Sequence, residues 1–264
     1  MTRIEKKFKE LRRKNKKAFI SFITCGDPNI EASFKLVLEL EHAGVDIIEL
    51  GVPFSDPLAD GPLIQAASER SLKHGTNLNT VISLIKRIRR RSQIPLAVMS
   101  YYNPIMSMGE GKFIRQASLA GLDGVIIPDL PPEEALELIT ACRKFKLNTI
   151  FFLSPTSSKE RIKLVARASN GFIYYVSLTG VTGIRSALHK ELENRVKLIK
   201  RFTSKPICVG FGVSNRNQVR KLSKFADGVI VGSAIVKKIQ DNLDKDDLVE
   251  RVGKFVRNLR GNNV

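Results

Sequence analysis

The sequence predicts an α/β fold: one TIM (β/α)8 barrel domain over residues 1–264, with an extra N-terminal helix. Eight short apolar segments alternate with amphipathic segments of helical periodicity, which is typical of parallel βα units. The chain has 264 residues, close to the size of about 250 that such a barrel takes. An open doubly wound sheet is the alternative, but no dinucleotide-binding fingerprint follows the first apolar segment.

The apolar segments are rich in β-branched residues and almost continuously apolar, as strands buried on both faces are. We expect strands at 18–24, 46–51, 95–102, 124–129, 148–154, 172–177, 206–211 and 227–233. The segments between them place apolar residues on one helical face. We expect helices at 31–43, 78–91, 111–120, 132–145, 158–169, 189–202, 214–224 and 245–260. Pro132 and Ser214 are typical helix starts, and Gly44, Gly121 and Gly171 lie where helices give way to strands.

The first residues of the chain predict the extra helix. Residues 1–17 are basic and lack the apolar stretch of a signal peptide. Ile4, Phe8 and Leu11 would share one face of a helix. The apolar runs elsewhere are only as long as strands, so we expect no membrane span.

The composition is strongly basic, with 44 Lys and Arg residues against 26 Asp and Glu residues, a net charge of +18. Basic clusters at 12–17 and 86–91 could contact nucleic acid. They lack interleaved aromatic residues, and no nucleic-acid-reading motif accompanies them. We therefore favour solvated helix surfaces over nucleic-acid contact. The charge would still attract phosphorylated metabolites and acidic partner surfaces.

The cysteines and histidines are dispersed along the chain. Three cysteines without a CxxC spacing indicate a reduced, cytoplasmic protein. The three histidines stand apart, and no Cys/His cluster suits zinc. We expect no metal and no cofactor in this chain.

Segment 46–62, DIIELGVPFSDPLADGP, carries the first candidate for chemistry. Glu49 interrupts an apolar strand, and the following loop adds Asp56 and Asp60. Active sites of such barrels lie at the C-terminal ends of the strands, where Glu49 could point into the barrel mouth. An apolar pocket would raise the pKa of Glu49, so that Glu49 and Asp60 could serve in acid/base chemistry. The alternative is a core salt bridge between Glu49 and an Arg or Lys of the barrel.

Glycine-rich stretches follow the last three predicted strands, at 177–183, 210–214 and 231–236. Glycine lets backbone N–H groups approach an anion closely, and helix N-termini favour anions. Phosphate sites are frequent after strands seven and eight of this fold. A small phosphorylated substrate would therefore lie across the mouth, and proton transfers alone would drive its reaction. Isomerisation, aldol-type cleavage and cyclisation remain open.

Taken together, these motifs resemble the tryptophan synthase alpha chain family. The resemblance covers nearly the whole chain, and ELGVPFSDPLADGPLIQ at 49–65 is its most specific part. The other motifs, in the family's order, are FITCGDP 22–28, YYNPI 101–105, IIPDLPPEE 126–134, YVSLTGVTG 175–183 and VGSAIV 231–236. The resemblance implies retro-aldol cleavage of indole-3-glycerol phosphate to indole and glyceraldehyde 3-phosphate. It also implies a beta-chain partner that holds pyridoxal phosphate, in a complex of two alpha and two beta chains.

The resemblance also implies roles for individual residues. Glu49 would be the general acid/base, and Asp60 would accept a hydrogen bond from the indole N–H. Thr182 would close over the substrate in a mobile loop and meet Asp60. Leu178 departs from some relatives, which carry Arg in that loop.

Three further groups of residues take their roles from the same resemblance. The walls of the indole pocket would consist of Phe22, Met99, Ile127, Phe152 and Phe211, and Tyr174 would be a pocket tyrosine near the substrate. The phosphate cradle would consist of Gly183, Gly212, Gly232 and Ser233. The positions that face the beta chain or relay its state would be Pro53, Asp56, Asn103 and Asp129.

Two other functions stay open at this point. The chain could be a largely non-catalytic regulatory subunit that activates the beta chain. It could also be another phosphate-binding barrel, such as a phosphoribosyl isomerase, although such enzymes resemble segment 49–65 poorly.

Overall fold

The strands form one parallel sheet that closes into a barrel. The computed structural model of the chain describes residues 1–176, 186–210 and 212–261. The strands are β1 (Ala18–Thr24), β2 (Ile47–Gly51), β3 (Leu96–Met99), β4 (Gly124–Ile126), β5 (Asn148–Ile150), β6 (Phe152–Leu153), β7 (Ile173–Val176), β8 (Ile207–Gly210) and β9 (Gly228–Val231). Their order is β5-β4-β3-β2-β1-β9-β8-β7-β6. Every neighbouring pair is parallel.

The two edge strands of this order are halves of one expected strand. Only Phe151 separates β5, which pairs with β4, from β6, which pairs with β7. The Phe151 carbonyl accepts a hydrogen bond from the backbone N–H of Tyr174 at 3.1 Å. The expected strand at 148–154 therefore bends at Phe151 and links both ends of the sheet. The predicted barrel of eight strands is confirmed, with one strand divided in two.

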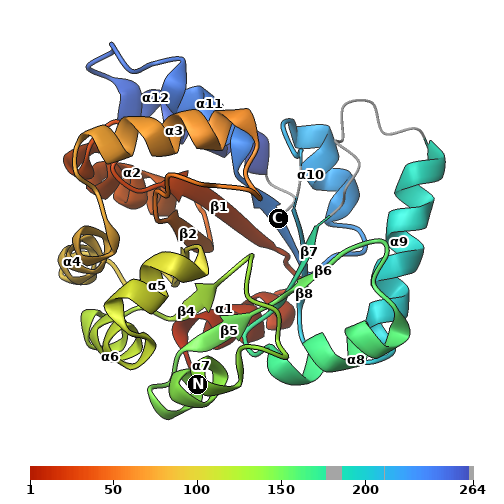
Figure 1. Ribbon diagram of the computed structural model, residues 1–264. Helices are drawn as coiled ribbons and strands as arrows, with labels where there is room; N and C mark the ends of the chain where they lie inside the picture. The colour runs from red at the N-terminus through yellow and green to blue at the C-terminus, as the bar shows by residue number, and fades with distance from the viewer. Residues whose placement is uncertain (177–185, 211, 262–264) are drawn as a thin grey trace.

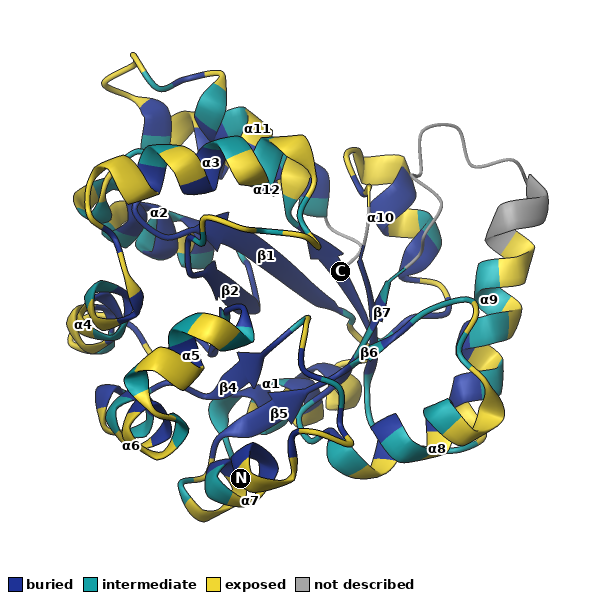
Figure 2. Cartoon of the chain, in the orientation of Figure 1, coloured by how far each residue is buried: buried dark blue, intermediate teal, exposed yellow. Residues whose placement is uncertain are grey.

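The helices surround the strands, as Figure 1 shows. They are α1 (Arg3–Arg13), α2 (Ile30–His42), α3 (Pro62–Lys73), α4 (Leu78–Arg89), α5 (Tyr102–Met108), α6 (Glu110–Ala120), α7 (Leu136–Lys144), α8 (Lys159–Ala168), α9 (Ser186–Lys200), α10 (Arg216–Leu222), α11 (Ser233–Gln240) and α12 (Leu248–Arg260). Figure 2 shows the strands buried and the exposed residues gathered on the helices and loops. None of the helices in the described ranges is long and apolar enough to cross a membrane.

Helix α1 closes one end of the barrel, which confirms the extra N-terminal helix. Thr2 caps the helix, and its side chain accepts a hydrogen bond from the Glu5 N–H at 3.2 Å. Ile4, Phe8 and Leu11 are buried and pack with the residues that fill the barrel. The Phe8 and Phe172 rings have centroids 5.8 Å apart. This packing seals the barrel opposite the C-terminal ends of the strands.

Strand residues alternate between two apolar layers, because successive side chains of a strand point to opposite faces. Ile20, Ile47, Ala97, Ile126 and Ile150 fill the barrel interior. Their neighbours on the strands pack outward against the helices in a much larger cluster. The inward face of each strand therefore supplies the floor of the barrel mouth.

Several expected boundaries were wrong. Helices α3 and α5 were not predicted. The expected strand 95–102 ends at Met99, and Tyr102 begins α5. Helix α7 begins at Leu136 and not at 132. The preceding residues form turns, in which the Glu134 N–H donates to the Pro131 carbonyl at 3.1 Å.

Candidate active site

Glu49 lies inside the barrel near the C-terminal end of β2. It stands opposite Phe22 of β1 and Ala97 of β3 in the strand register. Its side chain is completely buried, and burial raises the pKa of the carboxyl group to about 8. Neither carboxylate oxygen has a hydrogen-bond partner among the described residues. The expected alternative, a core salt bridge with Arg or Lys, is therefore wrong within the described part of the chain.

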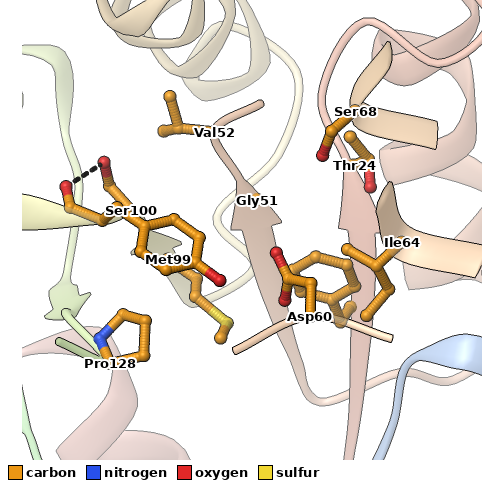
Figure 3. A pocket seen from close by; sticks show the side chains of 11 residues that line it. Thr24, Gly51, Val52, Asp60, Ile64, Ser68, Met99, Ser100 and Pro128 are labelled. Carbon is orange, nitrogen blue, oxygen red and sulfur yellow. Dashed lines mark hydrogen bonds between the residues drawn. The ribbon is translucent and has the colours of Figure 1, made fainter. Parts of the chain in front are cut away.

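Asp60 lies near the end of the loop between β2 and α3. Its N–H donates to the Pro57 carbonyl at 3.1 Å, and its own carbonyl accepts from the Gln65 side chain at 2.8 Å. Partial burial raises the pKa of the carboxyl group to about 6, while the nearby Tyr101 hydroxyl opposes this rise. Figure 3 shows Asp60 facing the pocket between Ile64 and Met99.

One cavity of about 620 Å³ extends from Asp60 to the glycine-rich residues that follow β8 and β9. Asp60 and Ile64, which follow β2, and Gly212, Gly232 and Ser233, which follow β8 and β9, all line it. Such a volume lies within the range of about 300 to 1,000 Å³ typical of small-molecule sites. A ligand in this cavity could contact Asp60 and the glycines at once.

Glu49 does not line the cavity but is the strand neighbour of a residue that does. Phe22, its register partner, belongs to the cavity wall, and so does Tyr174. Burial raises the pKa of the Tyr174 hydroxyl well above its usual value, and the charges of Glu49 and Asp60 add to the rise. Glu49 on β2 and Asp60 in the loop that follows β2 thus lie at the same end of the barrel.

The expected indole-pocket residues divide between the cavity and the core. Phe22, Met99, Phe152 and Tyr174 line the cavity. Ile127 does not, because it points outward and packs in the cluster between strands and helices. Its neighbour Pro128 lines the cavity instead. The expectation for Ile127 was therefore wrong: adjacent residues of a strand point to opposite faces, and it is the next residue that faces the cavity.

The glycine-rich end presents a helix N-terminus to the cavity. Gly232 is the residue before α11 and has no side chain to cap it. The first N–H groups of a helix have no partner within the helix, and the helix dipole makes this end positive. Gly212 has a φ of +65°, a left-handed conformation that favours glycine. Both features suit a phosphate group.

Four of the expected residues lie outside the described residues: Leu178, Thr182, Gly183 and Phe211. The four expected partner-facing positions differ in exposure. Pro53 is buried, whereas Asp56, Asn103 and Asp129 are exposed. The Asp129 carboxylate accepts the Tyr102 N–H, at 2.9 and 3.2 Å from its two oxygens.

Sequence reasoning missed Ile64, Tyr101 and Pro128, which also line the mouth. Ile64 is on α3, whose start Pro62 could have signalled. No local pattern distinguishes Tyr101 or Pro128 from packing residues. Within the described residues, no group of His, Cys, Asp or Glu could hold a metal ion.

Comparisons with known proteins identify the family of the chain. The family model described as "Tryptophan synthase alpha chain" matches residues 8–262. A relative described in the same words, from Geotalea uraniireducens (strain Rf4), is 48% identical over 260 residues, covering 98% of this chain and 97% of its own. Another, from Thermoanaerobacter sp. (strain X514), is 45% identical and covers 98% and 99% of the two chains.

Solved structures show the same likeness. The crystal structure of tryptophan synthase subunit alpha from Legionella pneumophila str. Paris has a TM-score of 0.92 and 37% identity, covering 98% of this chain and 97% of its own. A structure of the tryptophan synthase a2b2 complex from Pyrococcus furiosus has a TM-score of 0.85 and 38% identity, covering 92% and 97%. The chain belongs to the tryptophan synthase alpha chain family.

Proposed function

We propose that Glu49 carries the proton, and that Asp60 stabilises the polarised indole, in the cleavage of indole-3-glycerol phosphate to indole and glyceraldehyde 3-phosphate. This cleavage is the lyase reaction of the family in tryptophan biosynthesis. The observation that carries the proposal is the state of Glu49: completely buried, without a hydrogen-bond partner among the described residues, and beside Phe22, which lines the cavity. An isolated buried carboxyl group destabilises a fold, which is typical of groups kept for chemistry.

The substrate would lie across the mouth with its two ends in different surroundings. Its phosphate would meet the N-terminus of α11 at Gly232 and Ser233, with Gly212 beside them. Its indole ring would lie among apolar side chains such as Phe22 and Met99, with the ring N–H toward Asp60. The Asp60 carboxylate would accept that N–H, and its negative charge would stabilise positive charge that develops on the ring.

Cleavage then needs one proton to move from oxygen to carbon. Protonated Glu49 donates its proton to C3 of the indole, and the ring nitrogen gains positive charge facing Asp60. The Glu49 carboxylate takes the proton of the 3′-hydroxyl. The electrons of that O–H bond form the aldehyde, and the carbon–carbon bond electrons return to the ring. Glu49 ends protonated, so the balance requires no other reactant. A carboxyl pKa of about 8 suits a group that must both donate and accept near neutral pH.

The remaining roles follow the resemblance of the chain to its family. Tyr174 would border the substrate, Gly183 would join the phosphate cradle, Phe211 would border the indole, and Thr182 would close over the substrate. The partner would be a beta chain that carries pyridoxal phosphate, in a complex of two alpha and two beta chains. Pro53, Asp56, Asn103 and Asp129 would face that chain. The protein would act as one domain, 1–264, in the cytoplasm.

The deciding experiment is cleavage of indole-3-glycerol phosphate by the purified chain, with and without a cognate beta chain. Glu49→Gln should lower kcat by at least about 100-fold, as loss of a general acid/base does. Glu133→Gln is the matched control, because Glu133 is exposed and pairs with Arg161 at 2.7 Å. Cleavage by Glu49→Gln at the normal rate would refute the proton carrier. Stimulation of the beta reaction without cleavage by the unmodified chain would favour the regulatory subunit.

A further inference from the structure

Helices α3 and α11 begin at the cavity and lie beside each other, as Figure 1 shows. The first turn of each helix lines the cavity, and α11 contributes Ser233 there. Ala67 of α3 and Val236 of α11 are buried together with Phe22 in one apolar cluster. The spacing of the two helices therefore sets the distance between Asp60, which precedes α3, and the N-terminus of α11.

A buried ion pair lies near the far ends of the same two helices. Arg70, in the last turn of α3, donates from Nε and Nη2 to the two carboxylate oxygens of Asp27, at 2.8 and 2.9 Å. Its third nitrogen, Nη1, lies 3.4 Å from Oε1 of Gln240, the last residue of α11. Asp27 is 1% exposed and belongs to the loop that follows β1. One guanidinium group thus joins α3, α11 and the barrel.

The loop that carries Asp27 is itself fixed against the end of α3. The Ser71 hydroxyl of α3 donates to the Cys25 carbonyl at 2.5 Å. Gly26 has a φ of +83°, and a Cβ atom there would stand 2.1 Å from Oγ1 of Thr76 and 2.4 Å from Oγ of Ser71. Such close packing leaves the loop no room to shift, so Asp27 is a fixed anchor for Arg70.

The form of the ion pair favours a geometric role. The desolvation of two buried charges offsets most of their attraction, so a buried ion pair adds little net stability. Two parallel hydrogen bonds between a guanidinium fork and a carboxylate do fix the orientation of both groups. A lysine ammonium cannot reproduce this geometry.

We propose that Arg70 is a positioning residue for the cleavage. Its contacts with Asp27 and Gln240 hold α3 and α11 at the spacing that lets one substrate reach Asp60 and the N-terminus of α11 at the same time. This inference rests on the proposed function, because the spacing matters only to a ligand that contacts both ends of the cavity. Arg70 does not line the cavity, so it acts through the two helices.

Arg70→Met removes the fork and keeps an apolar stem. The aligned arrangement of the helices then becomes one of several, and a ligand that needs it binds more weakly in proportion to its population. KM for indole-3-glycerol phosphate should rise roughly 10-fold. The kcat should change less than about threefold, because bound substrate selects the aligned arrangement. Arg70→Lys should show most of the same rise in KM, since it keeps the charge without the fork.

Parts of the substrate separate positioning from a general defect of the site. Inorganic phosphate would contact only the α11 end of the cavity, and indole only the Asp60 end. Their inhibition constants should therefore change less than about twofold in Arg70→Met, since neither spans the two helices. Equal weakening of phosphate, indole and the whole substrate would overturn the inference, because a distorted site predicts that pattern.

Arg89→Met is the matched control for lost stability. Arg89 forms another buried ion pair, with Asp123 at 2.8 Å, at the opposite end of the barrel. This variant should lose stability in thermal unfolding and keep the normal KM. Asp27→Asn added to Arg70→Met removes the uncompensated carboxylate, so stability should recover in part while KM stays raised. A KM that recovers together with stability would overturn the inference.

Two outcomes of the same assay separate this inference from the proposed function. If the unmodified chain cleaves and Arg70→Met has the normal KM, only the inference on Arg70 fails. If the unmodified chain does not cleave, with or without a beta chain, the proposed function fails and the inference with it. Arg70→Lys leaves Asp27 compensated, and its KM decides the question if Arg70→Met does not fold.

Discussion

The ring of Phe22 occupies the space in which a side chain on Gly51 would lie. A Cβ atom on Gly51 would stand 2.5 Å from Cζ and 2.6 Å from Cε2 of Phe22. Phe22 is also the register partner of Glu49, and Gly51 follows Glu49 on the same face of β2. The ring thus covers the strand end just beyond the buried carboxyl group and helps to keep water from it.

Gly51→Ala should therefore push the Phe22 ring into the cavity. Contacts shorter than about 3 Å cannot persist, and such overpacking costs about 1 to 3 kcal/mol. We expect KM for indole-3-glycerol phosphate to rise several-fold, with a smaller fall in kcat. Steady-state kinetics and thermal unfolding would measure both effects.

Two variants test the cause of this effect. Phe22→Leu in the Gly51→Ala chain should restore part of the lost affinity, because the smaller side chain leaves room for the methyl group. Gly111→Ala is the control, since nothing lies within 4 Å of its Cβ position. An unchanged KM in Gly51→Ala would mean that the Phe22 ring does not border the bound substrate.

Glu49→Gln should make the protein more stable at alkaline pH. Burial raises the pKa of Glu49 from 4.5 to about 8 in the folded chain. Its favourable contribution is therefore complete below pH 4.5 and is lost as pH rises to 8, where the folded chain must ionise a buried group. One pKa unit corresponds to about 1.4 kcal/mol, so the variant should gain a few kcal/mol over the unmodified chain at pH 8 and above.

Urea unfolding at several pH values would measure this difference. The stability gap between Glu49→Gln and the unmodified chain should widen from pH 5 to pH 8 and then level off. Glu133→Gln, at an exposed position, should show no such gap. A gap independent of pH would mean that the pKa of Glu49 is not raised by folding.

The cleavage itself should have a bell-shaped pH dependence. The proposed mechanism needs Asp60 ionised and Glu49 protonated in the free enzyme. Their pKa values of about 6 and about 8 then predict that kcat/KM rises through pH 6 and falls through pH 8. Asp60→Asn should remove the acidic limb and keep the alkaline one. An acidic limb that persists in Asp60→Asn would assign it to another group.

Sequence patterns predicted the parts of the fold that depend on local properties. The apolar runs located every strand, because strands buried on both faces need continuous apolar residues. Tyr102 was wrongly joined to a strand because aromatic residues favour strands, whereas it begins α5. The bend at Phe151 and the closure of the barrel depend on pairing with two different neighbours, which no local pattern records.

The candidate site, like the fold, was predicted only where local sequence features reveal it. Glu49 was found because a carboxylate within an apolar strand is unusual in the sequence as well as in the structure. Its lack of a partner required the structure, since any Arg or Lys of the chain could have reached it. The contact between Tyr101 and Ala59 spans 42 residues of sequence, and a tyrosine after a strand resembles an ordinary core residue. Long-range hydrogen bonds of this kind cannot be read from spacing.

Gly212→Ala should weaken substrate binding more than it slows cleavage, because the phosphate does not react. Gly212 lines the cavity, and its φ of +65° strains any other residue. Gly75→Ala is a matched control for this strain, since Gly75 has a φ of +71° and nothing lies within 4 Å of its Cβ position. KM should rise several-fold in Gly212→Ala alone, and inorganic phosphate should inhibit this variant less than the unmodified chain. Equal loss of stability in both variants with an unchanged KM would show that Gly212 serves the turn and not the phosphate.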